Sequence, residues 1–174
     1  AKAVIRDVMI ASVQHHLVAD VPVGVFLSSG IDSTLIASIA ASLRNARIHT
    51  YTVRIKATGG IHDESPVSVA TARRINSIHE TVEIGVNALE EVLDDFICAL
   101  DVPSIDGLNT FLISKAVRQR TKVVLSGLGG DELFGGYPVF HEAYRLAHPK
   151  PFDHILHLLP RPVLYKLHIQ HLQY

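Results

Sequence analysis

The stretch Val23-Gly24-Val25-Phe26-Leu27-Ser28-Ser29-Gly30-Ile31-Asp32-Ser33 predicts a strand, a loop of small residues and the start of a helix. The apolar residues 21–27 are typical of a short buried strand, and apolar residues then recur at helical spacing over residues 31–43. In this order, the loop amides and the positive end of the helix dipole face one point, where they can bind a phosphate. The positions expected to face inward on this helix are Leu35, Ile36, Ile39 and Ala40.

Three serines, at positions 28, 29 and 33, surround Asp32 in the sequence. The loop has neither the lysine nor the GxxxxGK[ST] spacing of a Walker A loop. A carboxylate repels a phosphate unless a cation lies between them, so this composition favours Mg²⁺ as the bridge. The alternative is that Asp32 is only an acidic residue in the first turn of a helix, where it interacts with the helix dipole.

A second glycine-rich segment, Ser126-Gly127-Leu128-Gly129-Gly130-Asp131-Glu132-Leu133-Phe134-Gly135-Gly136-Tyr137, follows the apolar residues 122–125. It resembles the SGxGxDExFGGY signature of the synthetase domain of glutamine-dependent asparagine synthetases. Residues 28–33 resemble the SGGxDS loop of the ATP-pyrophosphatase superfamily, with Ser29 in place of its second glycine. The two segments occur in the order found in that family, and the resemblance covers about residues 3–140.

The resemblance implies an ATP site to which both segments contribute. Leu27 and Val53 would contact the adenosine, and the backbone of Ser126 and Gly127 would bind ATP. Asp32 and Asp131 would be the catalytic residues and would ligate Mg²⁺. The residues that would hold pyrophosphate are Ser28, Ser29, Gly30, Ile31, Asp32 and Ser33.

The resemblance also implies the reaction. A carboxylate substrate, aspartate in the family, attacks the α-phosphorus of ATP, pyrophosphate leaves, and ammonia from glutamine displaces AMP from β-aspartyl-AMP. The chain begins Ala1-Lys2-Ala3, without the cysteine nucleophile that opens the family's glutaminase domain. We therefore expect this sequence to be a segment that receives ammonia from a glutaminase domain not on this chain.

Several alternatives remain at this point. Leu128 stands where the family often has a glutamate, and leucine can neither ligate a metal nor move a proton. A related amidotransferase or β-lactam-type synthetase with another carboxylate acceptor is therefore one alternative, and a non-catalytic nucleotide-binding module is another. Gly135-Gly136 could serve only as a turn or helix stop, and Glu132 could cap or pair rather than ligate a metal.

Strands and helices alternate along the chain, which predicts an α/β fold with a doubly wound parallel sheet. The resemblance specifies the adenine-nucleotide alpha-hydrolase-like, Rossmann-like type. Ligands of such sheets bind at the carboxyl ends of strands, so we expect the strands ending at Leu27 and Leu125 to be neighbours. The strands are expected at residues 21–27, 48–53, 79–84 and 122–125, and the helices at residues 3–19, 31–43, from 63, 88–100 and 108–118.

Residues 1–140 are predicted to form the synthetase domain, and residues 141–174 the helical start of a C-terminal extension that is truncated here. The extension contains the histidine pairs His154/His157 and His168/His171, each spaced for one helical face. A metal site there is disfavoured, because no cysteine or carboxylate completes a ligand set. We expect these histidines to face solvent or a partner surface.

Composition narrows the class of protein. The chain is 48% hydrophobic and has no Trp, which is typical of an aliphatic-rich α/β protein. A net charge of −1 without a basic stripe argues against nucleic acid as a partner, and no apolar run is long enough for a membrane span. The single cysteine, Cys98, is expected in the core and cannot form an internal disulfide, which favours the cytoplasm. A homo-oligomer is compatible with these features.

Overall fold

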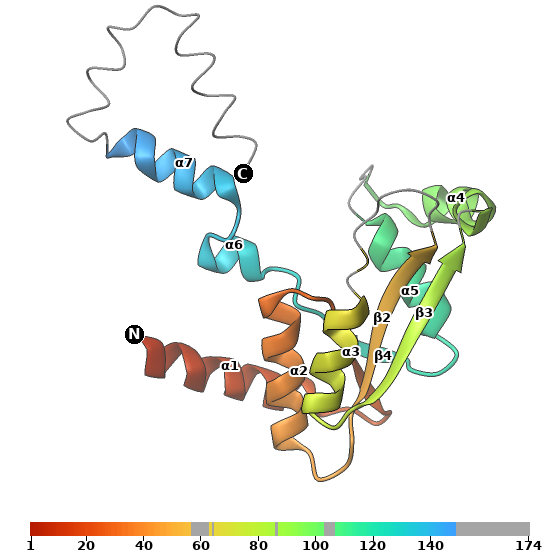
Figure 1. Ribbon diagram of the computed structural model, residues 1–174, viewed down its shortest axis with the longest axis horizontal. Coiled ribbons are helices and arrows are strands. Elements are labelled where there is room, and N and C mark those ends of the chain that lie inside the picture. Colours follow the sequence, from red (N-terminus) through yellow and green to blue (C-terminus); the bar gives the residue numbers. More distant parts are fainter. Residues whose placement is uncertain (57–62, 64, 86, 103–106, 149–174) are drawn as a thin grey trace, which may run out of the picture. The chain divides into compact units, whose positions relative to one another are not determined.

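A computed structural model of the chain describes residues 1–56, 63, 65–85, 87–102 and 107–148. The chain divides into two compact units, Ala1–Leu128 and Gly129–Tyr174. The first unit contains the whole described sheet, and the described part of the second unit is helical (Figure 1). The histidine pairs of residues 154–171 lie outside the described residues.

The sheet of the first unit has four parallel strands in the order β3-β2-β1-β4. Strand β1 pairs with β2 on one side and with β4 on the other. The predicted neighbours, the strands that lead to Leu27 and Leu125, are therefore adjacent, and the prediction of a parallel α/β sheet is confirmed. The strands are β1 (Val23–Phe26), β2 (His49–Lys56), β3 (Ile78–Gly85) and β4 (Val123–Leu125).

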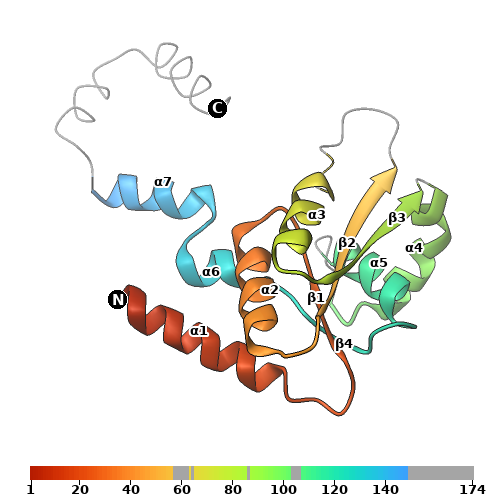
Figure 2. The ribbon, with the colours of Figure 1, turned by 60° about the horizontal axis from the view of Figure 1, so that its bottom comes forward.

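Helices pack on both faces of this sheet, as the doubly wound prediction requires (Figure 2). One face carries α1 (Lys2–His16), α2 (Ile31–Leu43) and α3 (Ser65–Arg74). The other carries α5 (Leu108–Val117), and α4 (Asn87–Ala99) packs beside α5 through Phe96 and Phe111. Within the described residues no helix is long and apolar enough to cross a bilayer.

The core forms two layers because successive residues of a strand point to opposite faces of a sheet. Val23, Val25 and Leu27 point into the layer under α1, α2 and α3. Phe26 points into the opposite layer, which contains Tyr51 and residues of α5. Val25 has no exposed surface and Leu27 is 2% exposed, so the strand before the candidate phosphate loop is anchored in the core.

Gly24 allows the Tyr51 ring to lie close against β1. A Cβ at position 24 would lie 2.8 Å from Tyr51 Cε2, which is closer than carbon atoms tolerate without displacement. The ring hydroxyl hydrogen-bonds to Thr121 just before β4. Tyr51 therefore links three neighbouring strands of the sheet on one face.

Two side chains expected in the core, Leu35 and Cys98, lie on the surface. In α2, Leu35 is 42% exposed, because the buried stripe is centred on Ala37 and Ala40. The small alanines let α2 approach the sheet closely. In α4, Cys98 is exposed while Phe96 is buried, since residues two apart on a helix point in nearly opposite directions. Ile36 packs only partly against the core.

Candidate active site

Loop 28–33 leads from the end of β1 into α2 and bonds largely to itself. The Ser28 N–H donates to Ser33 Oγ at 3.1 Å, and the two hydroxyl oxygens are 2.8 Å apart. The Gly30 N–H donates to Ser28 Oγ at 3.1 Å. The amides of Ser28 and Gly30 therefore donate to neighbouring hydroxyls, and the predicted contacts of residues 28–33 with pyrophosphate stay predictions.

The start of α2 remains the anion-facing part of the loop. Gly30 caps the helix in an extended conformation, and the first backbone N–H that bonds back into the helix is that of Thr34, to Gly30 O at 3.2 Å. The N–H groups of Ile31 and Asp32 come before that bond and have no intrahelical partner. Together with the helix dipole they favour a bound anion at this point.

Leu27 and Val53, the two predicted adenosine contacts, lie in different layers of the core. Leu27 is buried in the first core layer, so a nucleotide would reach only its backbone. Val53, on β2, is partly buried and packs on the layer that faces α5. The predicted adenosine contacts of these two residues stay predictions.

The beginning of the second signature lies directly on the first turn of α2. A Cβ at Gly127 would lie 2.7 Å from the Ser33 backbone nitrogen and 3.1 Å from the Asp32 carbonyl carbon. Only glycine permits this approach without displacing backbone. Ser126, beside it, accepts the Leu128 N–H through its hydroxyl at 3.3 Å. Ser126 and Gly127, predicted to bind ATP, therefore lie beside the predicted phosphate loop.

The rest of the second signature belongs to the second unit and forms the short helix α6 (Gly130–Phe134). Gly129 and Gly135 flank it in left-handed conformations, with φ of 95° and 68°. Gly135 is the C-cap, so the interpretation of this glycine as a helix stop is confirmed. No residue of α6 is buried.

Asp131 and Glu132 are held by contacts within α6 and the turn after it. The Gly136 N–H donates to the Asp131 carbonyl at 2.9 Å, and a Cβ at Gly136 would lie 1.9 Å from Asp131 Oδ1. The Tyr137 hydroxyl donates to Glu132 Oε1 at 2.7 Å. This hydrogen bond stabilises the ionised carboxylate and holds the pKa of Glu132 below its usual value. Glu132 therefore forms a hydrogen-bonded pair with Tyr137, and pairing is one of the roles that the sequence allows for it.

The two predicted metal ligands lie in different units. Asp32 is half-buried in the first unit and Asp131 is exposed in the second. Among the described side chains, no group of three or more His, Cys, Asp or Glu residues is arranged to hold a metal. One or two carboxylates still fit Mg²⁺, which commonly takes its remaining oxygens from substrate phosphates and water. The shared magnesium site stays a prediction.

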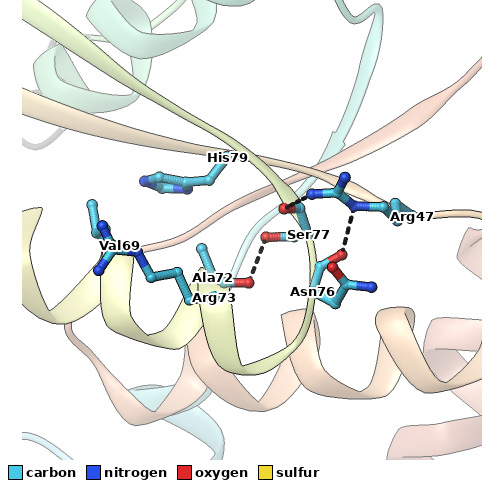
Figure 3. Close-up of a pocket in the computed structure, with 7 residues that line it drawn as sticks. All are labelled: Arg47, Val69, Ala72, Arg73, Asn76, Ser77 and His79. Carbon is cyan, nitrogen blue, oxygen red and sulfur yellow. Dashed lines mark hydrogen bonds between the residues drawn. The ribbon is translucent and has the colours of Figure 1, made fainter.

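A separate pocket of about 360 Å³ lies at the other end of β2 and β3 (Figure 3). Arg47 lines it and donates to the carbonyls of Asn76 and Ser77, at 3.0 Å each. These bonds hold the turn between α3 and β3, where Asn76 is left-handed with φ of 53°. Partial burial lowers the pKa of His79 at the edge of the pocket. No predicted site residue lines this pocket.

The comparisons with known proteins agree with the two signatures. The model of the asparagine synthase family matches residues 4–172. The chain belongs to the asparagine synthase family. A relative called putative asparagine synthetase [glutamine-hydrolyzing], from Mycobacterium tuberculosis (strain ATCC 25618 / H37Rv), is 39% identical over 163 residues, which cover 92% of this chain and 23% of the relative.

Two further relatives are similar to a smaller share of this chain. Asparagine synthetase [glutamine-hydrolyzing] 3 of Arabidopsis thaliana is 35% identical over 80% of this chain and 26% of its own length. Asparagine synthetase [glutamine-hydrolyzing] 1 of Bacillus subtilis (strain 168) is 34% identical over 87% of this chain and 23% of its own length. The chain spans about a quarter of the length of these curated relatives.

One solved structure supports the fold. The NH3-dependent NAD synthetase of Campylobacter jejuni aligns with a TM-score of 0.50 at 18% identity, covering 76% of this chain and 59% of that chain. The likeness confirms the predicted α/β fold type of the family.

Proposed function

We propose that the chain forms the ATP-binding part of an amide-forming ligase that adenylates aspartate and transfers ammonia from glutamine to make asparagine. One observation carries the proposal. The carboxyl end of β1, the first turn of α2 and Gly127 after β4 meet at one place on the sheet. Membership of the asparagine synthase family supports the same function.

Each segment has a distinct role in this proposal. The positive end of α2 binds the phosphates of ATP, and the backbone at Ser126 and Gly127 holds the nucleotide against it. Asp32 and Asp131 would hold Mg²⁺, which would supply positive charge next to the departing pyrophosphate. The buried anchoring of β1 keeps the loop in place while that charge moves.

Leu128 favours a second candidate acceptor. It is 76% exposed, and its side chain can neither accept a proton nor bind a cation. An acceptor that needs no acid or base at this position, such as another carboxylate substrate of a related amidotransferase, is the second candidate function.

The test is ATP–pyrophosphate exchange by the full-length protein with aspartate, with glutamate and without an acceptor. Exchange that depends on aspartate supports the asparagine synthetase reaction, and exchange that depends on another carboxylate supports the second candidate. No exchange with any carboxylate, in protein that is folded, would refute adenylation. Amide formation with glutamine and with ammonium then identifies the nitrogen source.

A further inference from the structure

Thr52 lies on β2 beside the point where β1 ends. Its side chain is 4% exposed, and its hydroxyl donates a hydrogen bond to the Leu27 carbonyl. The pairing of β1 with β2 ends where Phe26 lies opposite Tyr51. The Leu27 N–H still donates to the Tyr51 carbonyl at 2.8 Å. Tyr51 and Thr52 are consecutive residues of β2. Tyr51 therefore bonds to the N–H of Leu27, and Thr52 bonds to its carbonyl.

The Thr52 hydrogen bond also orients the next amide. The Leu27 carbonyl and the Ser28 N–H belong to one planar peptide unit and point in opposite directions. The Ser28 N–H donates to Ser33 Oγ at 3.1 Å, and the Ser33 hydroxyl in turn lies 3.2 Å from the Gly30 carbonyl, which accepts its proton. A continuous series of hydrogen bonds thus joins β2 to the first turn of α2.

We infer that Thr52 is a positioning residue for nucleotide binding. It holds the Leu27–Ser28 peptide plane, which orients Ser33 and with it the amino end of α2, before ATP arrives. The inference rests on the proposed function, since it assigns ATP to this loop. When the loop is already ordered in the free protein, ATP binding does not have to order it, and less entropy is lost on binding. Loss of the Thr52 hydroxyl should therefore weaken ATP binding.

The central test replaces Thr52 by valine, which keeps the shape and removes the hydroxyl. A hydrogen bond of this kind contributes about a three- to tenfold change in an equilibrium constant. We expect the KM for ATP of the full-length protein to rise about three- to tenfold, with a smaller change in kcat. Thr52→Ser retains the hydroxyl and should restore the KM. Thr52→Ala takes the place of the valine variant if that variant does not fold.

Thr50 provides a matched control on the same strand and the same face. Thr50 is fully buried, and its hydroxyl lies 2.8 Å from Ser77 Oγ and 3.0 Å from His79 Nδ1. Ser77 and His79 line the pocket (Figure 3). Thr50→Val removes an equally buried hydroxyl two residues earlier on the strand, where its partners are Ser77 and His79 and not the loop. We expect it to lower the thermal stability as Thr52→Val does and to leave the KM for ATP unchanged.

Two further measurements separate the inference from the proposed function. Hydrogen exchange of the Ser28 amide without ATP should be faster in Thr52→Val and unchanged in Thr50→Val. Ser33→Ala interrupts the same series of bonds, so the double variant with Thr52→Val should lose no more ATP affinity than the worse single variant.

An unchanged KM for ATP in Thr52→Val, an equal rise in Thr50→Val, or independent effects in the double variant would each overturn the role of Thr52. Wild-type protein that binds no ATP would instead refute the proposed function. The exchange of the Ser28 amide would then still report whether Thr52 orders the loop.

Discussion

The two signature segments each combine glycines with an aspartate, yet the protein holds them by different means. Loop 28–33 follows a strand buried in the core, and its Ser33 is 7% exposed and bonded to other loop residues. Residues 129–137 contain the short helix α6, which has no buried residue and lies between two glycines in left-handed conformations. The first segment depends on packing with distant residues, and the described contacts of the second are with residues close to it in the sequence.

This difference predicts how substitutions act in each segment. In the first, a changed side chain disturbs the core and the site together, so stability and activity fall together. In the second, the affected groups are exposed and local, so activity changes with little effect on the free energy of unfolding. The substitutions below test that separation, beginning with the largest expected effect.

Removing either carboxylate charge should have the largest effect on activity. Asp32→Asn and Asp131→Asn should each reduce ATP–pyrophosphate exchange by about a hundredfold or more, because each removes a charge proposed to stabilise the leaving group through a cation. Thermal unfolding monitored by circular dichroism should be nearly unchanged for Asp131→Asn, which is exposed. Asp20→Asn, at an exposed position before β1, is the control. If either the Asp32→Asn or the Asp131→Asn variant exchanges pyrophosphate at nearly the wild-type rate, the substituted aspartate is not part of the proposed site.

Gly127→Ala should reduce both stability and ATP affinity. The added Cβ would lie 2.7 Å from the Ser33 backbone nitrogen, and backbone cannot rotate away as a side chain can. We expect a loss of about 1–3 kcal/mol in the free energy of unfolding, typical of an overpacked site. The KM for ATP should rise with it, because the residues after β4 move away from α2. Urea unfolding and steady-state kinetics measure the two effects.

Gly136→Ala is the matching substitution within residues 129–137, whereas Gly127 lies where the second signature contacts the first turn of α2. Its Cβ would lie 1.9 Å from Asp131 Oδ1, so the exposed carboxylate must turn away. We expect unfolding to change by less than about 0.5 kcal/mol and pyrophosphate exchange to fall severalfold. A loss of stability as large as that of Gly127→Ala would show that residues 129–137 are held in the same way as the contact between Gly127 and α2.

Tyr137→Phe should have the smallest effect. It removes the hydrogen bond that holds the pKa of Glu132 below its usual value, so that pKa should rise toward the ordinary range. A lowered pKa in the folded state means that the bond stabilises the fold when Glu132 is ionised. Its contribution is therefore present at neutral pH and is lost as pH falls through the folded-state pKa. Titration of Glu132 by NMR measures the shift, and an unchanged pKa would contradict it.

Prediction from the sequence succeeded where a local pattern carries the information. The strand, loop and helix around Gly30 follow from the change in apolar spacing, and α2 begins and ends at the predicted residues. The adjacency of β1 and β4 followed from the rule that ligands of parallel sheets lie at the carboxyl ends of strands. Cys98 and Leu35 were placed wrongly, because helical spacing identifies a stripe but not which edge of it faces the sheet.

Thr52 shows why part of the site was missed. A threonine in a strand is already explained by β-propensity, so nothing in its neighbourhood marks a functional residue. Its partner Leu27 is 25 residues away, and the bond exists only because β1 and β2 pair in one register.

The sequence by itself determined the order of strands and helices, the two signatures and the family to which they belong, since each depends on residues close together in the chain. Tertiary structure alone decided which loop amides donate to loop hydroxyls, why position 127 must be glycine, and that β2 holds the end of β1. Those features depend on distances between atoms of separate strands and helices, and such distances are set only when the sheet assembles and its core closes.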